Sequence, residues 1–461
     1  MPYISRVAEK KLASIKIFEK NYKTKDGTSI RDYIHVMLAY GHVAMLKNIK
    51  AKKDLSIYNL GTGKGLSVLD VLKVFEKNIG NHIPFKFTKR RKGDMLISLC
   101  SPRKAARDLN WTPKYNKVMF FLNYNIMSKY LIVGGGGFIG GHLVSRLLNE
   151  NKKVRVVDIK PKNLWFQKFD KSENFSLDMQ EYENCLKMTD GIDYVLNLAC
   201  NMGGIGFIEN NKAECMLSVL INTNLLRACK KNNIQKYFYS SSACVYNKNL
   251  QTDPNILGLK EEDAYPAMPE DGYGWEKLFS ERMCKHFTED YGLETRVARF
   301  HNIYGPLGTF DGGREKAPAA ICRKVIEAKI KNSEHIDVWG DGTQTRSFLY
   351  IDDCIEAVLK LFESDYSSPI NIGSDEKVSI NELISIVENL AEKNFKRNYQ
   401  LDKPQGVKGR SSNNDLIKAT LNWNYSFSLK EGMSRTFDWI NDIYLNKKND
   451  ELIRFTTKNL N

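Results

Sequence analysis

A tyrosine and a lysine stand four residues apart in the segment Tyr273-Gly-Trp-Glu-Lys277. On a helix this spacing puts both side chains on one face, one turn apart. A lysine ammonium there can hold the ribose of a cofactor and lower the pKa of the phenol from about 10, which makes the phenolate a usable base near neutral pH. The pair comes about 30 residues after a strand-like segment that ends in the hydroxyls of Ser240 to Ser242. We therefore expect Tyr273 to move a proton beside a bound nucleotide cofactor.

A glycine-rich turn supplies the place for that cofactor. The apolar segment 129–133 runs into Gly134, Gly137 and Gly140, and helical spacing follows. Glycines at these positions permit a tight turn and close approach of the backbone to a pyrophosphate, which then faces a helix N-terminus. The next strand ends in Asp158, 18 residues past Gly140, where a carboxylate binds a ribose 2′-hydroxyl and repels a 2′-phosphate. The pattern predicts NAD as the cofactor rather than NADP.

Strand-like and helix-like segments alternate beyond this turn, which is typical of a Rossmann-type, doubly wound parallel sheet. The alternating segments are 154–158, 194–199, 213–231, 236–241, 275–291 and 295–300. We expect an α/β fold with a Rossmann core at about residues 128–305. A smaller C-terminal substrate lobe at about 306–445 should be interleaved with it.

The charge of the chain is concentrated in its first quarter. Residues 1–126 hold 25 Lys and Arg against 9 Asp and Glu, whereas the remaining residues hold 44 against 45. A compositional change of this size predicts a domain boundary at about Met127.

Composition also limits the classes of protein to which the chain can belong. No segment approaches the roughly 18 uncharged apolar residues of a membrane span, and the first residues lack the apolar run of a signal peptide. The nine cysteines are scattered singly without a CxxC pair, which suits reduced thiols and neither a disulfide framework nor a zinc site. We expect a cytoplasmic protein without a metal.

One block of sequence occurs twice. The segment 26–31 (DGTSIR) reappears at 341–346 as DGTQTR, and Leu109-Asn-Trp111 reappears as Leu421-Asn-Trp423. From the arginine to the tryptophan is 80 residues in the first copy and 77 in the second. Two copies are too few for a solenoid, so the spacing predicts duplication of one lobe. Only the second copy has a nucleotide-binding half in front of it.

Residues 127 to about 445 resemble the extended short-chain dehydrogenase/reductase superfamily and, within it, the GDP-mannose 3,5-epimerase family. The resemblance is carried by six motifs: NMGGIGF at 201–207, SSACVY at 241–246, RFHNIYGP at 299–306, GGREKAPAA at 312–320, WGDGTQTRSF at 339–348 and GVKGR at 406–410.

This resemblance implies a role for each of a set of side chains. Ser242, Tyr273 and Lys277 would carry the hydride transfer, and Cys244 and Lys316 would be the acid/base pair. The cofactor would be contacted by Gly134, Gly137, Phe138, Ile139, Gly140, Asp158, Asp178, Tyr273 and Lys277. The nucleotide sugar would be contacted by Gly203, Asn302, Glu315, Lys316, Ala317, Lys324, Gln344, Thr345, Arg346 and Arg410. It also implies a homodimer that binds a nucleotide sugar, GDP-mannose above others, and neither nucleic acid nor a membrane.

Residues 1–126 resemble the C-terminal part of the UDP-glucose 4-epimerase family. Segments 22–37, 41–43, 58–63 and 90–94 carry the likeness, which implies that Arg31, Arg91 and Asp94 would contact a uridine diphosphate. This part has neither a glycine fingerprint nor a Tyr-x3-Lys pair. We interpret it as an orphan, truncated substrate lobe, joined to a complete epimerase unit at 127–461 in which all catalysis takes place.

The chemistry can be derived from the sugar itself. A ring C–H bond beside only hydroxyls is too weakly acidic for a side chain to deprotonate, so inversion at C3 or C5 needs a ketone at C4 first. Transient oxidation by NAD⁺ supplies the ketone, and the hydride then returns, so that NAD⁺ is not consumed. The ordinary pKa values of Cys244, about 8.5, and Lys316, about 10.4, suit acid/base roles if their surroundings move both toward neutrality.

Two alternatives remain open. The first is another nucleotide-sugar 4-epimerase or 4,6-dehydratase, whose chemistry does not require Cys244 together with the 312–320 loop. The second is a non-catalytic, NAD-binding regulator whose basic segment 1–126 binds RNA. The lack of basic clusters interleaved with aromatic residues in 1–126 counts against the second.

Overall fold

The chain divides into two compact units, residues 1–127 and 128–461. The computed structural model describes residues 12–33, 56–79, 82–113 and 128–446, together with residues 3, 4, 7, 42 and 44–46. The predicted boundary residue Met127 lies outside the described residues. So do residues 34–37 of segment 22–37 and residues 41 and 43 of segment 41–43. In the part of the chain that is described, no helix is long and apolar enough to cross a membrane.

The second unit is built on a seven-stranded sheet in which every strand pair is parallel, as the alternation predicts. The strand order is β16-β11-β10-β9-β6-β7-β8, so the order reverses between β6 and β9. In such sheets, ligands bind at the carboxyl edge beside this reversal. The strands are β6 (Lys129–Val133), β7 (Lys153–Asp158), β8 (Glu173–Ser176), β9 (Tyr194–Asn197), β10 (Lys236–Ser242), β11 (Glu294–Phe300) and β16 (Ile370–Ile372).

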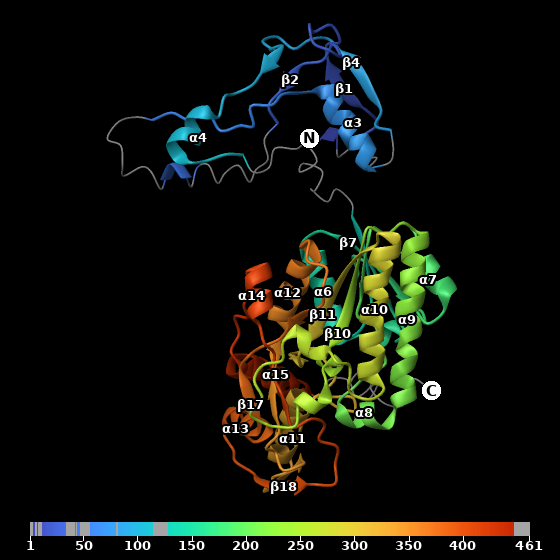
Figure 1. Cartoon of the computed structure of the whole chain (residues 1–461), viewed down its shortest axis with the longest axis vertical. Coiled ribbons are helices and arrows are strands. Elements are labelled where there is room, and N and C mark those ends of the chain that lie inside the picture. Colours follow the sequence, from blue (N-terminus) through green and yellow to red (C-terminus); the bar gives the residue numbers. More distant parts are fainter. Residues whose placement is uncertain are drawn as a thin grey trace. The chain divides into compact units, whose positions relative to one another are not determined.

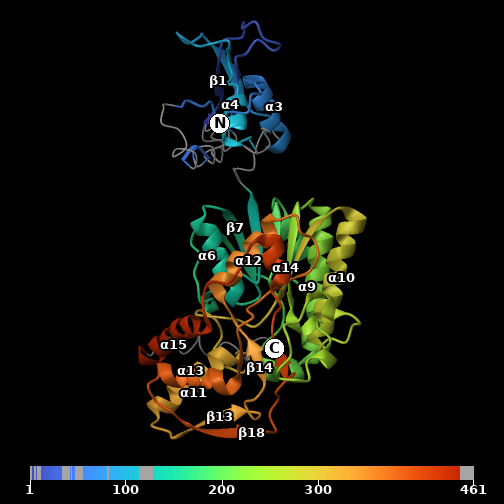
Figure 2. The ribbon, with the colours of Figure 1, turned by 60° about the vertical axis from the view of Figure 1, so that its left-hand side comes forward.

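Helices cover both faces of this sheet. On one face α7, α9 and α10 pack on Leu131 and Val133, and on the other α6 and α12 pack on Tyr130 and Ile132. From Tyr130 to Val133, strand β6 is therefore apolar, because successive side chains point to opposite faces and both faces are buried. Figures 1 and 2 show α9 and α10 side by side, and α6 close to α12. The helices are α6 (Phe138–Asn149), α7 (Tyr182–Thr189), α9 (Lys212–Lys231), α10 (Tyr273–Tyr291) and α12 (Ile351–Glu363).

The boundaries differ little from expectation. The structure starts α10 at Tyr273, two residues before the predicted start, and ends β9 at Asn197, two residues before the predicted end. The early start puts Tyr273 itself in the first helical turn. The early end of β9 leaves Leu198 and Ala199 in the loop that also contains Cys200, which packs against Tyr273 of α10.

A smaller lobe is interleaved with the Rossmann core, because β16 and α12 return from it to the sheet and its face. The lobe contains a parallel pair, β13 (His335–Trp339) with β18 (Lys396–Gln400), and a three-stranded sheet in the order β17 (Lys377–Ser379), β14 (Thr345–Ser347), β19 (Gly409–Arg410). Its helices are α11 (Ala317–Ile330), α13 (Ile380–Leu390), α14 (Asp415–Leu421) and α15 (Leu429–Leu445).

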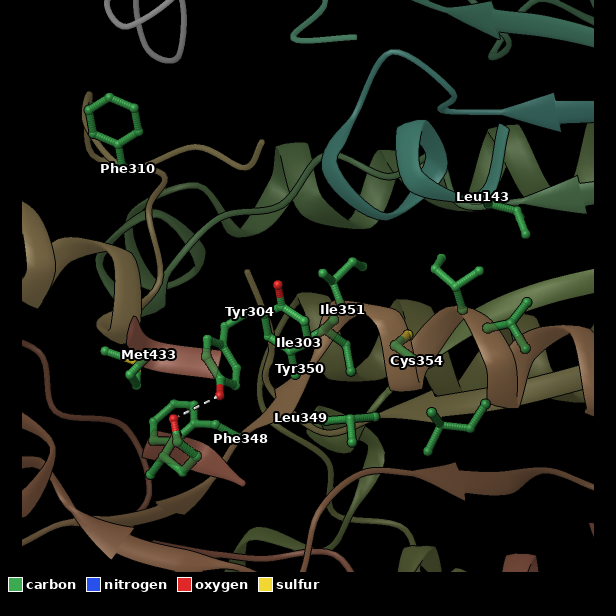
Figure 3. Packing of buried hydrophobic residues seen from close by; sticks show 14 of the residues in the cluster. Leu143, Ile303, Tyr304, Phe310, Phe348, Leu349, Tyr350, Ile351, Cys354 and Met433 are labelled. Carbon is green, nitrogen blue, oxygen red and sulfur yellow. Dashed lines mark hydrogen bonds between the residues drawn. The ribbon is translucent and has the colours of Figure 1, made fainter. Parts of the chain in front are cut away.

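One apolar cluster joins the lobe to the core. The strands β12 (Ile303–Tyr304) and β15 (Leu349–Tyr350) are parallel, and the ring centres of Tyr304 and Tyr350 lie 5.8 Å apart. Met433 of α15 belongs to the same cluster (Figure 3). The hydroxyl of Tyr304 donates a hydrogen bond to the carbonyl of Leu429 at 3.2 Å, so this buried polar atom is satisfied. A continuous core of this kind holds the two halves of the unit in one arrangement.

The first unit has a small core of its own. Helix α3 (Val68–Ile79) packs Val71, Leu72 and Phe75 against Ile15 and Ile17. Its strands form a parallel pair, β1 (Ile15–Phe18) with β4 (Phe85–Thr88), and a three-stranded sheet in the order β3 (Leu66–Ser67), β2 (Ile30–Arg31), β5 (Ile97–Ser98); helix α4 spans Arg103–Leu109.

The sequence repeat is a repeat of structure. In both units the middle strand of the three-stranded sheet runs antiparallel to one neighbour and parallel to the other. Helices α4 and α14 both end at an asparagine, Asn110 or Asn422, in the left-handed conformation. The turns at Asp26 and Asp341 also match, since each carboxylate accepts hydrogen bonds from the amide and hydroxyl of the threonine two residues on.

Candidate active site

A cavity of about 320 Å³ lies in the second unit, lined by the ends of core strands and by the lobe. Ser242 ends β10, Tyr273 begins α10, and Lys316 immediately precedes α11. The cavity brings together twelve of the predicted residues: Gly203, Ser242, Cys244, Tyr273, Asn302, Glu315, Lys316, Ala317, Lys324, Gln344, Arg346 and Arg410.

Thr345 is the predicted substrate contact that does not line this cavity. Its hydroxyl donates a hydrogen bond to the carbonyl of Pro254 instead. The alternation of β14 explains the difference, because Thr345 and Arg346 are successive strand residues and their side chains point to opposite faces.

Lys277 lies behind the cavity, one helical turn from Tyr273. Its ammonium donates to the carbonyl of Ser240 at 3.0 Å and lies 5.5 Å from the centre of the Tyr273 ring. The side chain is 1% exposed and also lies 3.7 Å from the Glu276 carboxylate. The helix spacing thus produces the predicted juxtaposition, with the lysine fixed in place from the strand side.

The expected lowering of the Tyr273 pKa is wrong for the protein alone. Burial raises the pKa of this phenol, and the nearby Cys200, Cys244 and Glu276 raise it further, while a hydrogen bond with Ser242 acts in the opposite direction. The Lys277 ammonium is shared with Glu276 and with the Ser240 carbonyl, so little of its charge acts on the phenol. A positive group added beside the phenol is needed to make it a base near neutral pH.

Cys244 and Lys316 approach the cavity from different elements. Cys244 lies in a short 3₁₀ helix, Ala243–Val245, and its sulfur accepts a hydrogen bond from the Arg410 guanidinium at 3.6 Å. Burial raises the pKa of Cys244, and the Glu270 carboxylate raises it further. Burial lowers the pKa of Lys316. The condition that both pKa values move toward neutrality is therefore met by Lys316 and not by Cys244 in the protein alone.

Two arginines of the lobe sheet stand beside each other in this cavity. Arg346 and Arg410 are register partners in the parallel pair β14 and β19. Burial lowers the pKa of Arg346 to about 10, and the charge of Arg410 contributes. Two adjacent guanidinium groups on one wall are suited to a diphosphate, whose two negative groups would relieve their repulsion.

The glycine-rich turn has the shape that a dinucleotide requires. Gly134 has φ +83°, and a Cβ there would lie 2.9 Å from the amide nitrogen of Ala199. A Cβ on Gly140 would overlap the carbonyl oxygen of Gly134. The N-terminus of α6, at Phe138 and Ile139, therefore opens at the carboxyl edge beside the reversal of strand order, where its unpaired amide groups can bind phosphate.

Two carboxylates stand farther along the same edge. Asp158 ends β7 and is buried, and Asp178 follows β8, the next strand of the sheet. Each accepts a backbone hydrogen bond two residues on, from Lys160 and Gln180. The turn and the two acids fit NAD: the turn would hold the pyrophosphate and Asp158 the ribose, with Asp178 near the adenine. Among the described residues, no group of three or more His, Cys, Asp or Glu side chains could hold a metal ion.

Several lining residues were not found from the sequence. Glu270 forms an ion pair with Arg410, Arg323 forms one with Glu315 at 3.0 Å, and Trp339 supplies an aromatic wall that is 41% exposed. Glu270 stands three residues before Tyr273, and Arg323 directly precedes the predicted Lys324. Proximity to these residues was the signal for Glu270 and Arg323, since a charged residue near the surface is ordinarily solvated, and Trp339 begins the quoted 339–348 motif.

The Rossmann sheet, the glycine turn and a cavity that combines Tyr273 with two arginines define an NAD-dependent enzyme that acts on nucleotide sugars. Residues 130–373 match the NAD dependent epimerase/dehydratase family, and the chain belongs to that family. The chain is 46% identical over 315 residues to GDP-mannose 3,5-epimerase of Arabidopsis thaliana, covering 68% of this chain and 82% of that protein. It is an NAD-dependent nucleotide-sugar epimerase.

Two further relatives match this chain, one in sequence and one in structure. The UDP-glucose 4-epimerase of Bacillus subtilis is 47% identical over 115 residues, which cover 25% of this chain and 34% of that protein. The structure of UDP-glucuronic acid 4-epimerase from Bacillus cereus, in complex with UDP-glucuronic acid and NAD, matches with a TM-score of 0.59 and 25% identity, covering 68% of this chain and all of that one. The resemblances to the two epimerase families and the Rossmann fold are thereby confirmed.

Proposed function

We propose that the second unit interconverts GDP-mannose and its 3,5-epimerised product. The observation that carries the proposal is that Cys244 and Lys316 line the same cavity as Tyr273. An epimerase that inverts only C4 needs no acid/base pair besides the tyrosine, because no ring carbon next to the ketone is deprotonated. The 46% sequence identity with GDP-mannose 3,5-epimerase of Arabidopsis thaliana supports the same assignment.

The proton transfers can be assigned to side chains of this chain. NAD⁺, when bound, supplies the oxidising power, since it accepts a hydride from C4 and later returns it. The deprotonated oxygen of Tyr273 would take the proton of the C4 hydroxyl, with Ser242 as its hydrogen-bond partner, and Lys277 would hold the cofactor ribose. When NAD⁺ is bound, the positive charge of its nicotinamide would act against the rise in the pKa of Tyr273.

Cys244 and Lys316 would then act on the ring carbons beside the ketone. One group removes a proton from C3 or C5, and the other delivers a proton to the opposite face of the same carbon. They are suited to this because they approach the cavity from separate elements, a 3₁₀ helix after β10 and the N-terminus of α11. Arg346 and Arg410 would hold the diphosphate, and Asn302, Glu315, Lys324 and Gln344 the remaining polar groups.

The test is incubation with GDP-mannose in deuterated water, with the product analysed by NMR. We expect deuterium at C3 and C5 and product inverted at both carbons. Cys244→Ala and Lys316→Ala should each lose at least about 10²-fold of this product, the usual contribution of a general acid or base. Cys100→Ala, a thiol of the first unit, is the matched control and should behave as wild type.

An epimerised product from the Cys244→Ala variant at a near-native rate would overturn the proposal. A simple 4-epimerase would then be the better assignment, and UDP-glucose would be the substrate to try. Retention of NAD by both variants shows that the loss of product is not caused by unfolding.

We further propose a homodimer that forms through α9 and α10. Met216, Leu217 and Leu220 on α9, and Trp275 and Phe279 on α10, are each between 41% and 51% exposed although they are large and apolar. Neighbouring helices that expose such a patch are typical of a protein–protein interface. Light scattering should give twice the chain mass, and Leu220→Glu should give monomers.

Two remaining proposals concern location and domain organisation. A cytoplasmic location is supported by nine cysteines that are all free. We propose that residues 1–126 form a lobe like that of UDP-glucose 4-epimerase which takes no part in the reaction, and that residues 127–461 carry all of the catalysis, with a core at about 128–305.

A further inference from the structure

Glu270 and Cys244 line the same cavity. Glu270 lies in the loop before α10, and its backbone amide donates a hydrogen bond to the carbonyl of Cys244 at 3.0 Å. Its side chain lines the cavity and is 14% exposed. The adjacent Asp271 is different, because its carboxylate is 66% exposed and pairs with Lys212 at 2.8 Å, away from the cavity.

Arg410 connects Glu270 to the thiol. One terminal nitrogen of its guanidinium forms an ion pair with Glu270, the other lies 3.6 Å from the sulfur of Cys244, and Nε donates to Gln251 at 2.7 Å. The Arg410 side chain is 7% exposed, so this arrangement is screened from water. Its positive charge favours a thiolate, whereas the carboxylate on its far side compensates that charge.

The other groups around Cys244 are mostly cationic or weakly acidic. Lys316 and Arg346 face it from the loop before α11 and from β14, Tyr273 from α10, and the thiols Cys200 and Cys215 from the loop after β9 and from α9. Of the two other lining carboxylates, Glu315 is held by Arg323 and Asp337 by Asn398. Glu270 is thus the acid that opposes the two guanidinium groups, Arg346 and Arg410, at this thiol.

We propose that Glu270 is a positioning residue that pairs with Arg410 and so keeps Cys244 a protonated thiol in the resting enzyme. The proposal rests on the proposed function for its catalytic meaning. A thiol can deliver a proton to a ring carbon: the S–H bond breaks, the C–H bond forms, and the thiolate left behind lies beside Arg410. Lys316, whose pKa burial lowers, is the amine that removes a proton at the opposite face.

The protonation state can be measured without turnover. The full chain with NAD and without sugar is treated with iodoacetamide between pH 6 and 10, and the modified Cys244 peptide is quantified by mass spectrometry, with Cys244→Ser as the blank. Since only the thiolate reacts, the midpoint reports its formation. In wild type we expect a midpoint above the ordinary value of about 8.5. A wild-type midpoint below that value overturns the proposal, and this measurement needs no variant of Glu270.

Variants then test the role of Glu270. Glu270→Gln keeps the shape and removes the charge, so Cys244 should be alkylated about tenfold faster at pH 7, equivalent to one pKa unit. Glu270→Asp should restore slow alkylation, and Asp271→Asn, which removes the same charge one residue away, should match wild type. An unchanged or higher midpoint in Glu270→Gln would show that Glu270 only shapes the loop.

Activity separates this proposal from the proposed function. In Glu270→Gln the pH profile of kcat/KM should move in the same direction as the alkylation midpoint. If Cys244→Ala is fully active while the alkylation results hold, the proposed function fails and the role of Glu270 in setting the thiol stands. If Cys244→Ala is inactive and Glu270→Gln leaves alkylation unchanged, the proposed function stands and the role of Glu270 in setting the thiol fails.

Discussion

The two copies of the lobe have the same local structure, but their equivalent arginines have different surroundings. Arg31 in β2 and Arg346 in β14 occupy equivalent strand positions, and each donates to the carbonyl of the residue before it. Arg31 then pairs with Asp94 at 2.5 Å, whereas Arg346 lines a cavity together with Arg410 and Cys244. A lobe folds from its own sequence, but its arginine becomes part of a site only where a Rossmann edge supplies the facing residues.

The largest effect should come from the residue that only the second unit possesses. Replacing Tyr273 by Phe removes the phenol that takes the proton of the C4 hydroxyl, so oxidation and every later step stop. We expect a loss of at least about 10³-fold in kcat and no deuterium at any ring carbon, because this group precedes all exchange. Deuterium at C3 or C5 without a functional Tyr273 would show that deprotonation does not depend on the ketone.

The equivalent arginines give the most direct test of the comparison. Arg346→Ala should weaken binding of the nucleotide sugar by about tenfold or more, since a charge-assisted contact contributes roughly 1.5–3 kcal/mol. Arg31→Ala is the matched control and should leave kcat/KM unchanged. Steady-state kinetics with GDP-mannose distinguish the two. An equal loss in both variants would mean that the first unit shares in the site.

Acid should affect the second unit through a buried histidine. Burial lowers the pKa of His301 to about 3, and its Nε2 lies 2.9 Å from Oδ1 of the Asn371 side chain. The folded-state value lies below the unfolded value of about 6.5, so the unfolded chain binds the extra proton and stability falls as the pH drops from 6.5 toward 3. The slope is at most about 1.4 kcal/mol per pH unit.

Urea unfolding measures this slope, because five of the six tryptophans lie beyond residue 127 and their fluorescence reports the second unit. Between pH 6.5 and 5 wild type should lose up to about 2 kcal/mol more than His301→Gln, which has no imidazole to protonate. Equal losses in the two proteins would mean that His301 has the same pKa in the folded and the unfolded chain.

The smallest effect is expected from removing the first unit altogether. A chain that begins at Ser128 contains every residue assigned to the reaction. Its kcat/KM should stay within tenfold of the full chain, or about 1.4 kcal/mol of transition-state stabilisation. A greater loss would show that residues 1–127 contribute to the active site.

The sequence was sufficient where structure depends on neighbouring residues. The glycine turn, the strand ends at Asp158 and Ser242, and the Tyr273–Lys277 spacing follow from local periodicity, and the structure reproduces each. The repeat was readable for the same reason, since the Asp26 and Asp341 turns and the Asn110 and Asn422 helix ends depend on adjacent residues.

Only the tertiary structure decided what those side chains experience. Glu270 meets Arg410 from 140 positions away in the chain, and Thr345 is turned from the cavity by the alternation of a strand three residues long. The pKa of Tyr273 and of Cys244 rises rather than falls because burial removes water, and spacing along a chain carries no measure of burial. The sequence by itself determined which groups could react, and packing determined the charge that each one carries, because desolvation and distant ion pairs exist only in the folded molecule.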